Sequence, residues 1–287
     1  MHLTIGIPTY NRSSKLNKML NSLLKQEFND FEIIISDNGS IDQTEQVCIN
    51  FKNQFKKFNY FKQKKTIHVL DNYKYLFDKC RTKYFMWLPD DDIIEENYIK
   101  NCFNYIINNK DYVLVSGQCK YYINNKFSFE GNKINIEDEN VNKRVYRHYS
   151  EARDNGNFYG IYDKEKILDF IYPKEYGGDL IFLGNIILFG KFKCLNSTTI
   201  HRDLGSGTSG SLENVVKVLK LSKLQLYFFH YVCAYDIFIN STLVKKRYKN
   251  KIKLSYFFNI ICSFYYLKKN FIESMTHLIK SLIIKKK

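Results

Sequence analysis

Three consecutive aspartates, Asp90, Asp91 and Asp92, follow an apolar segment at residues 84–88. Adjacent carboxylates repel one another, so holding three of them at the end of a strand is costly unless a divalent cation or hydrogen-bond donors offset the repulsion. A metal and ligand site is one arrangement that does so. An acidic turn that caps the following helix is the other, because Asp is favoured at helix starts.

The elements that must position this triplet alternate between strand and helix over the first ninety residues. Apolar segments predict strands at residues 3–7, 31–35 and 84–88, with a weaker one at 66–70. Apolar residues at helical spacing predict four amphipathic helices, marked by Leu16, Met19, Leu20, Leu23 and Leu24, by Cys48, Phe51, Phe55 and Phe58, by Tyr73, Leu76, Phe77 and Cys80, and by Ile94, Tyr98, Ile99, Cys102, Phe103 and Ile106.

Local signals also predict where two of these helices begin. Ser40 and Gln43 have the form of a capping box, and Asp71 or Asn72 would cap the helix after the third strand. Alternating strands and helices predict an α/β fold with a mostly parallel sheet and helices on both of its faces.

In such a sheet, ligands bind beyond the carboxyl ends of the strands. The polar residues that follow the four predicted strands are Pro8, Thr9, Tyr10, Asn11 and Arg12, then Asp37, Asn38, Gly39 and Ser40, then Asp71 and Asn72, then Asp90 to Asp92. Four polar strand ends along one edge favour a ligand site over a simple acidic turn.

The second half of the chain is less regular. Residues 111–149 are predicted to be rich in β-structure, with a strand at 112–122 and a hairpin turn at Asn124-Asn125 before residues 126–129. Helical character returns near residues 164–171, and Asp179 could cap a helix that runs to residue 189. Two domains are predicted. The first is a catalytic domain at 1–211, with a nucleotide-sugar-binding half at 1–110 and an acceptor half at 111–211. The second is a basic, aromatic-rich helical extension at 212–287, which follows a Gly/Ser loop at 206–211.

Composition narrows the class of protein. The chain is 45% hydrophobic, its seven cysteines form no CxxC pair, and its formal net charge is +15. Scattered cysteines favour a reducing cytoplasm over a disulfide framework or a zinc site. The start of the chain lacks the pattern of a signal peptide. The longest uncharged apolar stretch near the end, residues 254–267, is 14 residues long, shorter than the roughly 20 that a spanning helix needs.

Most of the positive charge lies near the end of the chain. Residues 243–287 contain twelve lysines or arginines and one acidic residue, interleaved with aromatic side chains. This pattern is typical of an interfacial segment that binds an anionic membrane surface. It is equally typical of a helical packing or homo-oligomerisation module with solvated lysines. We expect no nucleic-acid binding, because no nucleic-acid-binding fold signature accompanies the basic residues.

Three segments resemble a known family. Residues 5–12, residues 34–42 and the aspartate triplet are similar to inverting family 2 glycosyltransferases with the GT-A fold. Residues 71–73 followed by residues 84–92 resemble the branch that contains abequosyltransferases of bacterial O-antigen assembly. The match is specific over residues 3–108 and fades beyond residue 110.

The resemblance implies a nucleotide-diphosphate-sugar donor, expected to be a UDP-sugar, and a DXD-type motif at the triplet. Asp92 would ligate Mg2+ or Mn2+, because hard cations prefer carboxylate and phosphate oxygens. Asp90 and Asp91 would bind ribose hydroxyls or the sugar, and Asp37 would accept a hydrogen bond from the base. The remaining donor-binding residues that it implies are Pro8, Thr9, Asn11, Arg12, Asn38 and Asn72.

On the acceptor side, the resemblance implies a carboxylate base at the start of a helix. Asp179 corresponds to it, although Gly178 stands where the family has Glu; a helix N-cap without chemistry is the alternative. His201 would complete the metal shell or lie on an exposed loop, and Arg202 could meet the diphosphate. Trp87 fits a core role better than ligand stacking.

The expected function is metal-assisted, inverting sugar transfer to a hydroxyl of a glycan or undecaprenyl-linked glycan during synthesis of a bacterial surface polysaccharide, either lipopolysaccharide O-antigen or capsule. The expected location is the cytoplasm, peripheral on the inner face of the membrane. The alternative is a non-catalytic nucleotide- or glycan-binding protein with a degenerate transferase domain, tethered to the membrane. An intact aspartate triplet argues against that alternative.

Overall fold

The computed structural model describes residues 2–152, 154–167 and 178–204. The Gly/Ser loop and the helical extension predicted at 206–287 lie outside these residues. The strands are β1 (Leu3–Thr9), β2 (Phe31–Asp37), β3 (Phe58–Lys62), β4 (Tyr84–Trp87), β5 (Ile93–Ile94), β6 (Tyr112–Ile123), β7 (Lys126–Glu130), β8 (Ile161–Asp163) and β9 (Lys191–Asp203). The α-helices are α1 (Ser13–Leu24), α2 (Thr44–Phe51), α3 (Val69–Lys79), α4 (Tyr98–Asn108), α5 (Val141–Glu151) and α6 (Gly178–Ile186).

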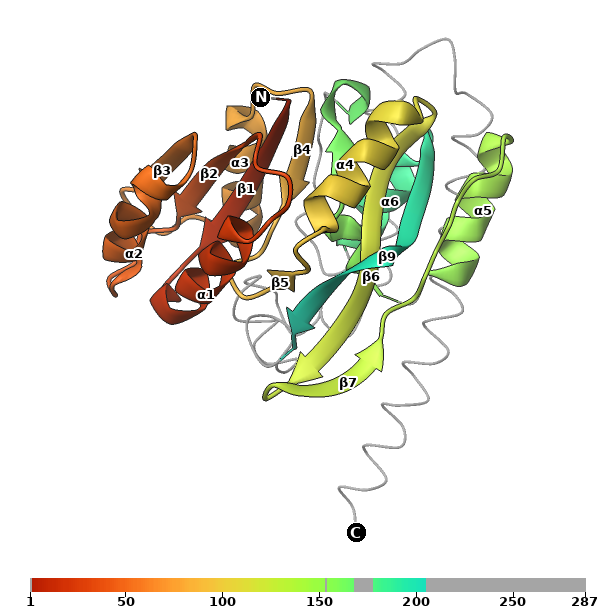
Figure 1. Ribbon diagram of the computed structural model, residues 1–287. Coiled ribbons are helices and arrows are strands. Elements are labelled where there is room, and N and C mark those ends of the chain that lie inside the picture. The colour runs from red at the N-terminus through yellow and green to blue at the C-terminus, as the bar shows by residue number, and fades with distance from the viewer. Residues whose placement is uncertain (1, 153, 168–177, 205–287) are drawn as a thin grey trace, which may run out of the picture.

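The first half of the chain forms four parallel strands in the order β3-β2-β1-β4. Helices α1 and α2 cover one face of these strands and α3 covers the other (Figure 1). Strands β1 and β2 are buried along their whole length, which explains why they appear in the sequence as continuous apolar segments. The predicted parallel α/β arrangement is confirmed for this half.

The second half extends the same sheet with mixed pairing. Strand β8 pairs antiparallel with both β4 and β6, and the long strands β6 and β9 run parallel to each other. The sheet order ends in β9-β5, and β7 pairs with β6 outside that path. The β6–β7 hairpin turns at Asn124 and Asn125, which have φ values of 51° and 62°; asparagine tolerates this left-handed region. The predicted hairpin is confirmed.

Trp87 lies at the centre of an aromatic cluster that joins the two halves. Its ring centroid is 5.6 Å from that of Phe77 on α3 and 5.1 Å from that of Phe158 in the second half. Phe182 of α6 meets it edge-on at 6.0 Å. Trp87 is fully buried and its indole Nε1 donates to the Tyr73 carbonyl at 3.1 Å. The predicted core role is confirmed, and this packing fixes the strand that leads into the aspartate triplet.

Three sequence predictions in the first half are wrong. The third strand is β3, not residues 66–70, because α2 ends at Phe51 and the chain then extends alongside β2. Phe58 therefore belongs to a strand rather than to a helix face. The predicted capping box is not formed either: α2 begins at Thr44, whose backbone N–H donates to Asp42 Oδ1 at 3.0 Å.

Four other sequence predictions also differ from the structure. Helix α3 begins after His68, whose Nδ1 accepts from the Leu70 N–H, so Asn72 lies inside the helix instead of capping it. Ile94, predicted on a helix face, belongs to β5. The segment expected to be rich in β-structure contains α5, which is capped by Asn140. Near residue 164 the chain forms a 3-10 turn at Lys164–Ile167, and residues 168–171 lie outside the described residues.

Among the described residues, no helix has both the length and the apolar character needed to cross a membrane.

Candidate active site

The carboxyl ends of β1, β2 and β4 meet at one edge of the sheet, as the sequence predicts. Thr9 and Asp37 end their strands, and the aspartate triplet follows β4 within three residues. Asn72 approaches the same edge from α3, although the strand expected before it does not exist. Its Nδ2 donates to the Ser36 carbonyl at 2.9 Å, and Ser36 Oγ donates to its Oδ1 at 2.6 Å.

The loops after β1 and β2 hold each other in shape. The Asn11 N–H donates to Ser40 Oγ at 2.8 Å, and Asn11 Oδ1 accepts from the Ile41 N–H at 2.9 Å. Asn11 has a φ of 52° and Gly39 one of 83°, so both residues adopt the left-handed backbone that these tight loops need. Pro8 lies in β1 opposite Ser36.

Asp37 and Asn38 are also buried in this loop framework. Asp37 accepts from the Ser40 N–H at 2.8 Å and from the Tyr60 hydroxyl at 2.6 Å. Asn38 pairs with the backbone of Ile67 in both directions, at 3.0 Å and 2.9 Å. These two predicted donor-binding residues therefore also stabilise the loop after β2 through hydrogen bonds within the protein.

Arg12 spans the first two aspartates of the triplet. Its Nη1 lies 3.0 Å from Asp90 Oδ1 and 2.9 Å from Asp91 Oδ2. Burial alone would lower the pKa of Arg12, but Asp90 and Asp91 raise it overall. Burial raises the pKa of the Asp90 carboxyl, and the charge of Arg12 opposes that shift. Arg12 contacts only Oδ1 of Asp90; the buried Thr9 hydroxyl lies on the same carboxyl group, and its hydrogen bond also opposes the rise in the Asp90 pKa.

Asp92 pairs with a different arginine. Arg202, near the end of β9, donates from Nε to Asp92 Oδ2 at 2.9 Å. Burial raises the pKa of Asp92 to about 7, and the charge of Arg202 opposes that shift. The guanidinium carbon of Arg202 lies 4.0 Å from the ring centroid of Tyr159 and 5.5 Å from that of Tyr121, so the cation is packed between aromatic rings.

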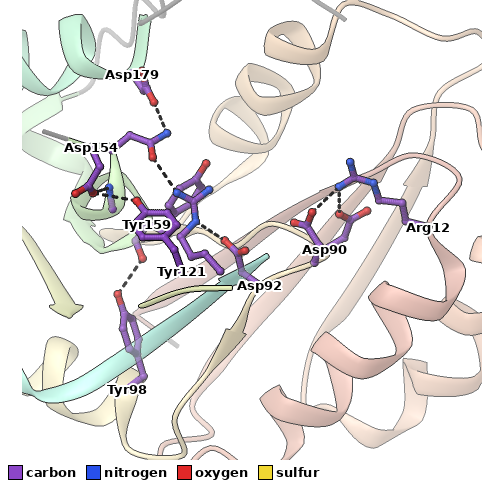
Figure 2. Close-up of polar contacts among 12 residues, drawn as sticks. Arg12, Asp90, Asp92, Tyr98, Tyr121, Asp154, Tyr159 and Asp179 are labelled. Carbon is purple, nitrogen blue, oxygen red and sulfur yellow. Dashed lines mark hydrogen bonds and ion pairs between the residues drawn. The ribbon is translucent and has the colours of Figure 1, made fainter. Parts of the chain in front are cut away.

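The polar chain continues from Arg202 to the helix that carries Asp179. Arg202 Nη1 donates to Asn155 Oδ1 at 2.8 Å, and Asn155 Nδ2 donates to Asp179 Oδ2. Figure 2 shows this series of contacts running from Asp92 to Asp179. Asp179 lies in the first turn of α6, and its Oδ1 accepts from the Leu180 N–H at 3.0 Å. The structure therefore brings the predicted base and the predicted metal ligand into one network.

His201 does not join this network. Successive residues of a strand face opposite sides of the sheet, so Arg202 meets Asp92 while the His201 ring faces elsewhere. Its Nδ1 is 3.0 Å from the Tyr122 hydroxyl, and its Nε2 is 3.7 Å from Glu95. A ligand role for His201 stays a prediction; the contacts of its ring are with Tyr122 and Glu95 rather than with Asp92.

The described residues contain no cluster of three or more His, Cys, Asp or Glu that could enclose a cation by itself. Mg2+ does not require one, because it usually binds through one or two carboxylates together with substrate phosphates. Asp91 and Asp92 supply oxygen ligands of that kind, and Asp90 adds a third carboxylate at the same strand end. The donor set therefore fits a hard divalent ion that arrives with a diphosphate.

Asn155, Tyr159 and Tyr60 are site residues that sequence reasoning missed. Asn155 and Tyr159 come from a short segment between α5 and β8, and Tyr60 comes from the strand that was misassigned. Only the clustering of turn-forming residues at 154–157 marks this segment in the sequence. Their contacts with Arg202 and Asp37 span long distances along the chain, and local patterns do not encode such contacts.

The sequence model of glycosyl transferase family 2 matches residues 4–170, which is more than half of the chain. The chain therefore belongs to glycosyltransferase family 2, and the resemblance seen in its first 108 residues is confirmed. It is a glycosyltransferase. The carboxylates at the strand ends, Asp37 and Asp90 to Asp92, lie within the matched residues.

Two relatives give the match more detail. The chain is 25% identical over 238 residues to GalNAc(5)-diNAcBac-PP-undecaprenol beta-1,3-glucosyltransferase of Campylobacter jejuni, an alignment that covers 77% of this chain and 73% of the relative. It is 23% identical to glycosyltransferase GlyA of Streptococcus pneumoniae, over 82% of this chain but only 30% of GlyA. This chain thus corresponds to a part of some longer proteins.

Solved structures share the fold. The structure of S. aureus TarS 1–349 in complex with UDP-GlcNAc matches with a TM-score of 0.61 and 17% identity, covering 83% of this chain and 66% of that one. The structure of TarS 1–349 without a named ligand matches with a TM-score of 0.59, and this chain spans 65% of it. The predicted GT-A fold is confirmed by this likeness, which at such identity concerns the fold alone.

Proposed function

We propose that this protein transfers a sugar from a UDP-sugar to a hydroxyl of a glycan, with inversion at the sugar carbon. The observation that carries the proposal is the hydrogen-bonded series from Asp92 through Arg202 and Asn155 to Asp179. It connects carboxylates at the strand ends to a carboxylate on α6. An inverting transfer needs these two groups on opposite sides of the reacting carbon, one near the leaving diphosphate and one near the attacking hydroxyl.

The donor would lie along the edge formed by β1, β2 and β4. Arg12 offers charge-assisted donors to the diphosphate and would then exchange part of its contact with Asp90 and Asp91. Asp90 and Thr9, which lie side by side at this edge, would bind ribose or sugar hydroxyls. Asp37 keeps acceptor capacity for a base N–H, while Pro8, Asn11, Asn38 and Asn72 shape the loop around the nucleoside. The structures of S. aureus TarS in complex with UDP and with UDP-GlcNAc support a uridine donor.

Asp92, assisted by Asp91, would hold Mg2+ or Mn2+ together with the donor phosphates. When bound, such an ion would act as a Lewis acid that stabilises charge on the departing nucleotide. Arg202 stabilises the same carboxylate by its own charge at 2.9 Å. His201, whose ring contacts the Tyr122 hydroxyl, would be a further ligand of that ion.

Asp179 would be the general base. Asn155 Nδ2 donates to Asp179 Oδ2 and so holds the carboxyl group in one orientation. The ionised group could take the proton of the acceptor hydroxyl as that hydroxyl attacks.

We further propose that the acceptor is an undecaprenyl-linked glycan of a bacterial surface polysaccharide, either O-antigen or capsule. The C. jejuni relative is named as a glucosyltransferase that acts on an undecaprenol-linked glycan, which supports this class of acceptor. The basic residues at 243–287 would hold the protein at the anionic inner face of the membrane. The β6–β7 hairpin supports the same location, since Ile123, Phe127 and Phe129 are exposed. The rival role for the basic residues is homo-oligomerisation.

A panel of UDP-, GDP-, CDP- and dTDP-sugars tests the activity. We expect release of the nucleotide from a UDP-sugar, with water as acceptor, in the presence of Mn2+ or Mg2+ and much less in EDTA. Asp179→Asn should lower the turnover by about 10²–10⁴-fold, the usual contribution of a general base, and leave UDP affinity unchanged by calorimetry.

Absence of turnover with every donor, combined with intact UDP binding, would favour the alternative of a non-catalytic binding protein. Full activity of Asp179→Asn would remove Asp179 from the mechanism. Flotation with anionic and neutral liposomes at low salt tests the membrane proposal separately, because surface attraction is least screened there.

A further inference from the structure

Asn155 is the link between the two charged groups on either side of the site. Its side-chain oxygen faces Arg202 at 2.8 Å, and its side-chain nitrogen faces Asp179. A guanidinium can only donate and an ionised carboxylate can only accept. A carboxamide satisfies both neighbours at once, whereas a carboxylate or an aliphatic side chain at this position would not.

The segment that carries Asn155 is held rigidly. Asp154 Oδ1 accepts from the Gly156 N–H at 2.7 Å and from the Tyr121 hydroxyl at 2.9 Å, and Asp154 Oδ2 accepts from the Asn132 N–H at 2.6 Å. Gly156 is packed so closely that a Cβ there would lie 2.7 Å from Cys119 Cβ. The backbone of Asn155 is therefore anchored to β6 independently of α6.

The cation at the centre of the network is equally constrained. Arg202 lies 4.0 Å from the Tyr159 ring, and Tyr159 follows Asn155 on the same short segment. The guanidinium is thus held by a stacking ring, by Asp92 and by the Asn155 carboxamide. The orientation of the carboxamide is fixed on the Arg202 side, so its nitrogen has a defined direction toward Asp179.

We infer that Asn155 is a positioning residue. It orients the Asp179 carboxylate toward the acceptor, and it couples that orientation to the position of Arg202 on the donor side. The inference rests on the proposed function, because it assigns to Asn155 the alignment of the proposed base. A misplaced catalytic group of this kind costs about 10²-fold in rate.

Within the described part of the chain, Tyr159, Tyr162 and, beyond Asn155, Arg202 face Asp179, and His148 contacts the carbonyl of the next residue, Leu180. Burial raises the pKa of both tyrosines, with Asp179 contributing in the same direction. They therefore stay neutral near pH 7. An aspartate at position 155 would keep an acceptor toward Arg202 and bring a second negative charge against Asp179, which raises the pKa of a neighbouring carboxyl.

Two variants of the full chain test the inference with the UDP-sugar that the wild type hydrolyses. Asn155→Ala should lower kcat by about 10–100-fold while UDP affinity, measured by calorimetry, stays within about twofold. Asn155→Asp should shift the acidic limb of the kcat–pH profile to higher pH, a change that a merely structural role would not produce. Asn157→Ala is the matched control, since Asn157 lies two residues away and its side-chain oxygen accepts from Ser116 Oγ at 3.1 Å, away from the network.

The outcomes are distinguishable. If the wild type hydrolyses no donor, the proposed function fails. If the wild type is active and both Asn155 variants match it in kcat and pH profile, the inference about Asn155 is wrong. A thermal melt checks folding, and the pH shift of a folded Asn155→Asp supports the inference even if Asn155→Ala unfolds.

Discussion

Arg12 and Arg202 both neutralise the aspartate triplet, but their surroundings differ. The Arg12 side chain keeps 29% of its surface exposed and contacts two carboxylates. Arg202 keeps 14%, pairs with an aspartate that is 2% exposed and is packed against aromatic rings. An exposed arginine can exchange partners with an incoming anion at small cost, whereas a buried one is held by several contacts. The donor side of the site is therefore adaptable, and the side toward Asp179 is fixed.

The largest effect is expected when the two arginines are replaced in turn. Arg202→Met leaves the buried Asp92 charge without its partner, and we expect the free energy of unfolding to fall by about 3–5 kcal/mol. Arg12→Met also unpairs a buried carboxylate, Asp90, but it should cost less, about 1–2 kcal/mol, because 29% of the Arg12 side chain is exposed and water can replace it beside Asp90. Urea denaturation of both variants measures the difference.

The double variant Arg202→Met with Asp92→Asn serves as the control for that comparison. It should be more stable than Arg202→Met alone, because removing the unpaired charge relieves most of the penalty. Equal losses for Arg202→Met and Arg12→Met would contradict the contrast.

The free energy of unfolding should also depend on pH through His148, which lies on the fixed side of the site. This buried side chain donates from Nε2 to the Leu180 carbonyl at 2.9 Å, which joins α5 to the first turn of α6. Burial lowers the pKa of His148 to about 4. The unfolded chain, with an ordinary value near 6.5, therefore binds a proton first as the pH falls. Stability from this group is complete above pH 6.5 and decreases between pH 6.5 and 4.

The expected loss is at most about 3 kcal/mol over that range. Urea denaturation at pH 7.5, 6.0 and 4.5 measures it, with His148→Asn as the reference. The wild type should lose more stability than the variant on acidification; parallel pH profiles would show that His148 does not contribute.

A smaller effect is expected on the donor side at Tyr60. Its hydroxyl donates to the buried Asp37 at 2.6 Å, so Tyr60→Phe removes one donor to a charged group. We expect a loss of about 1–2 kcal/mol in the free energy of unfolding. UDP affinity should fall a few-fold, because the β2 loop is less well ordered. Calorimetry measures the affinity, and an unchanged value would separate Asp37 from donor binding.

The smallest effect is expected at the surface. Lys62 and Glu45 form an ion pair at 2.9 Å, and their side chains are 40% and 51% exposed. Glu45→Gln should leave the free energy of unfolding unchanged within the error of urea denaturation, since solvent and salt screen exposed pairs. A larger loss in urea denaturation would mean that burial does not separate strong from weak pairs in this protein.

The sequence predicted the adaptable side better than the fixed one. Strands β1, β2 and β4 are buried segments with polar residues at their ends, so periodicity located them together with Asp37 and the triplet. Strand β3 was missed because Phe55 and Phe58 fit the spacing of a helix face.

The fixed side depends on contacts between residues far apart in the chain. Asp92 meets Arg202 across 110 positions, and Arg202 meets Asn155 across 47. No local pattern encodes such pairs, although Asp179 was found through the family resemblance. His201 and Arg202 are neighbours in sequence, but only the strand geometry of β9 determines which of them faces the triplet.

The aromatic cluster around Trp87 also has a spectroscopic consequence. The sequence contains a single tryptophan, and it lies three residues before Asp90, stacked between Phe77 of the first half and Phe158 of the second. Its emission therefore originates from the seam between the halves. The protein carries an intrinsic fluorophore at the position where docking of the halves and occupation of the neighbouring site should be visible without a label.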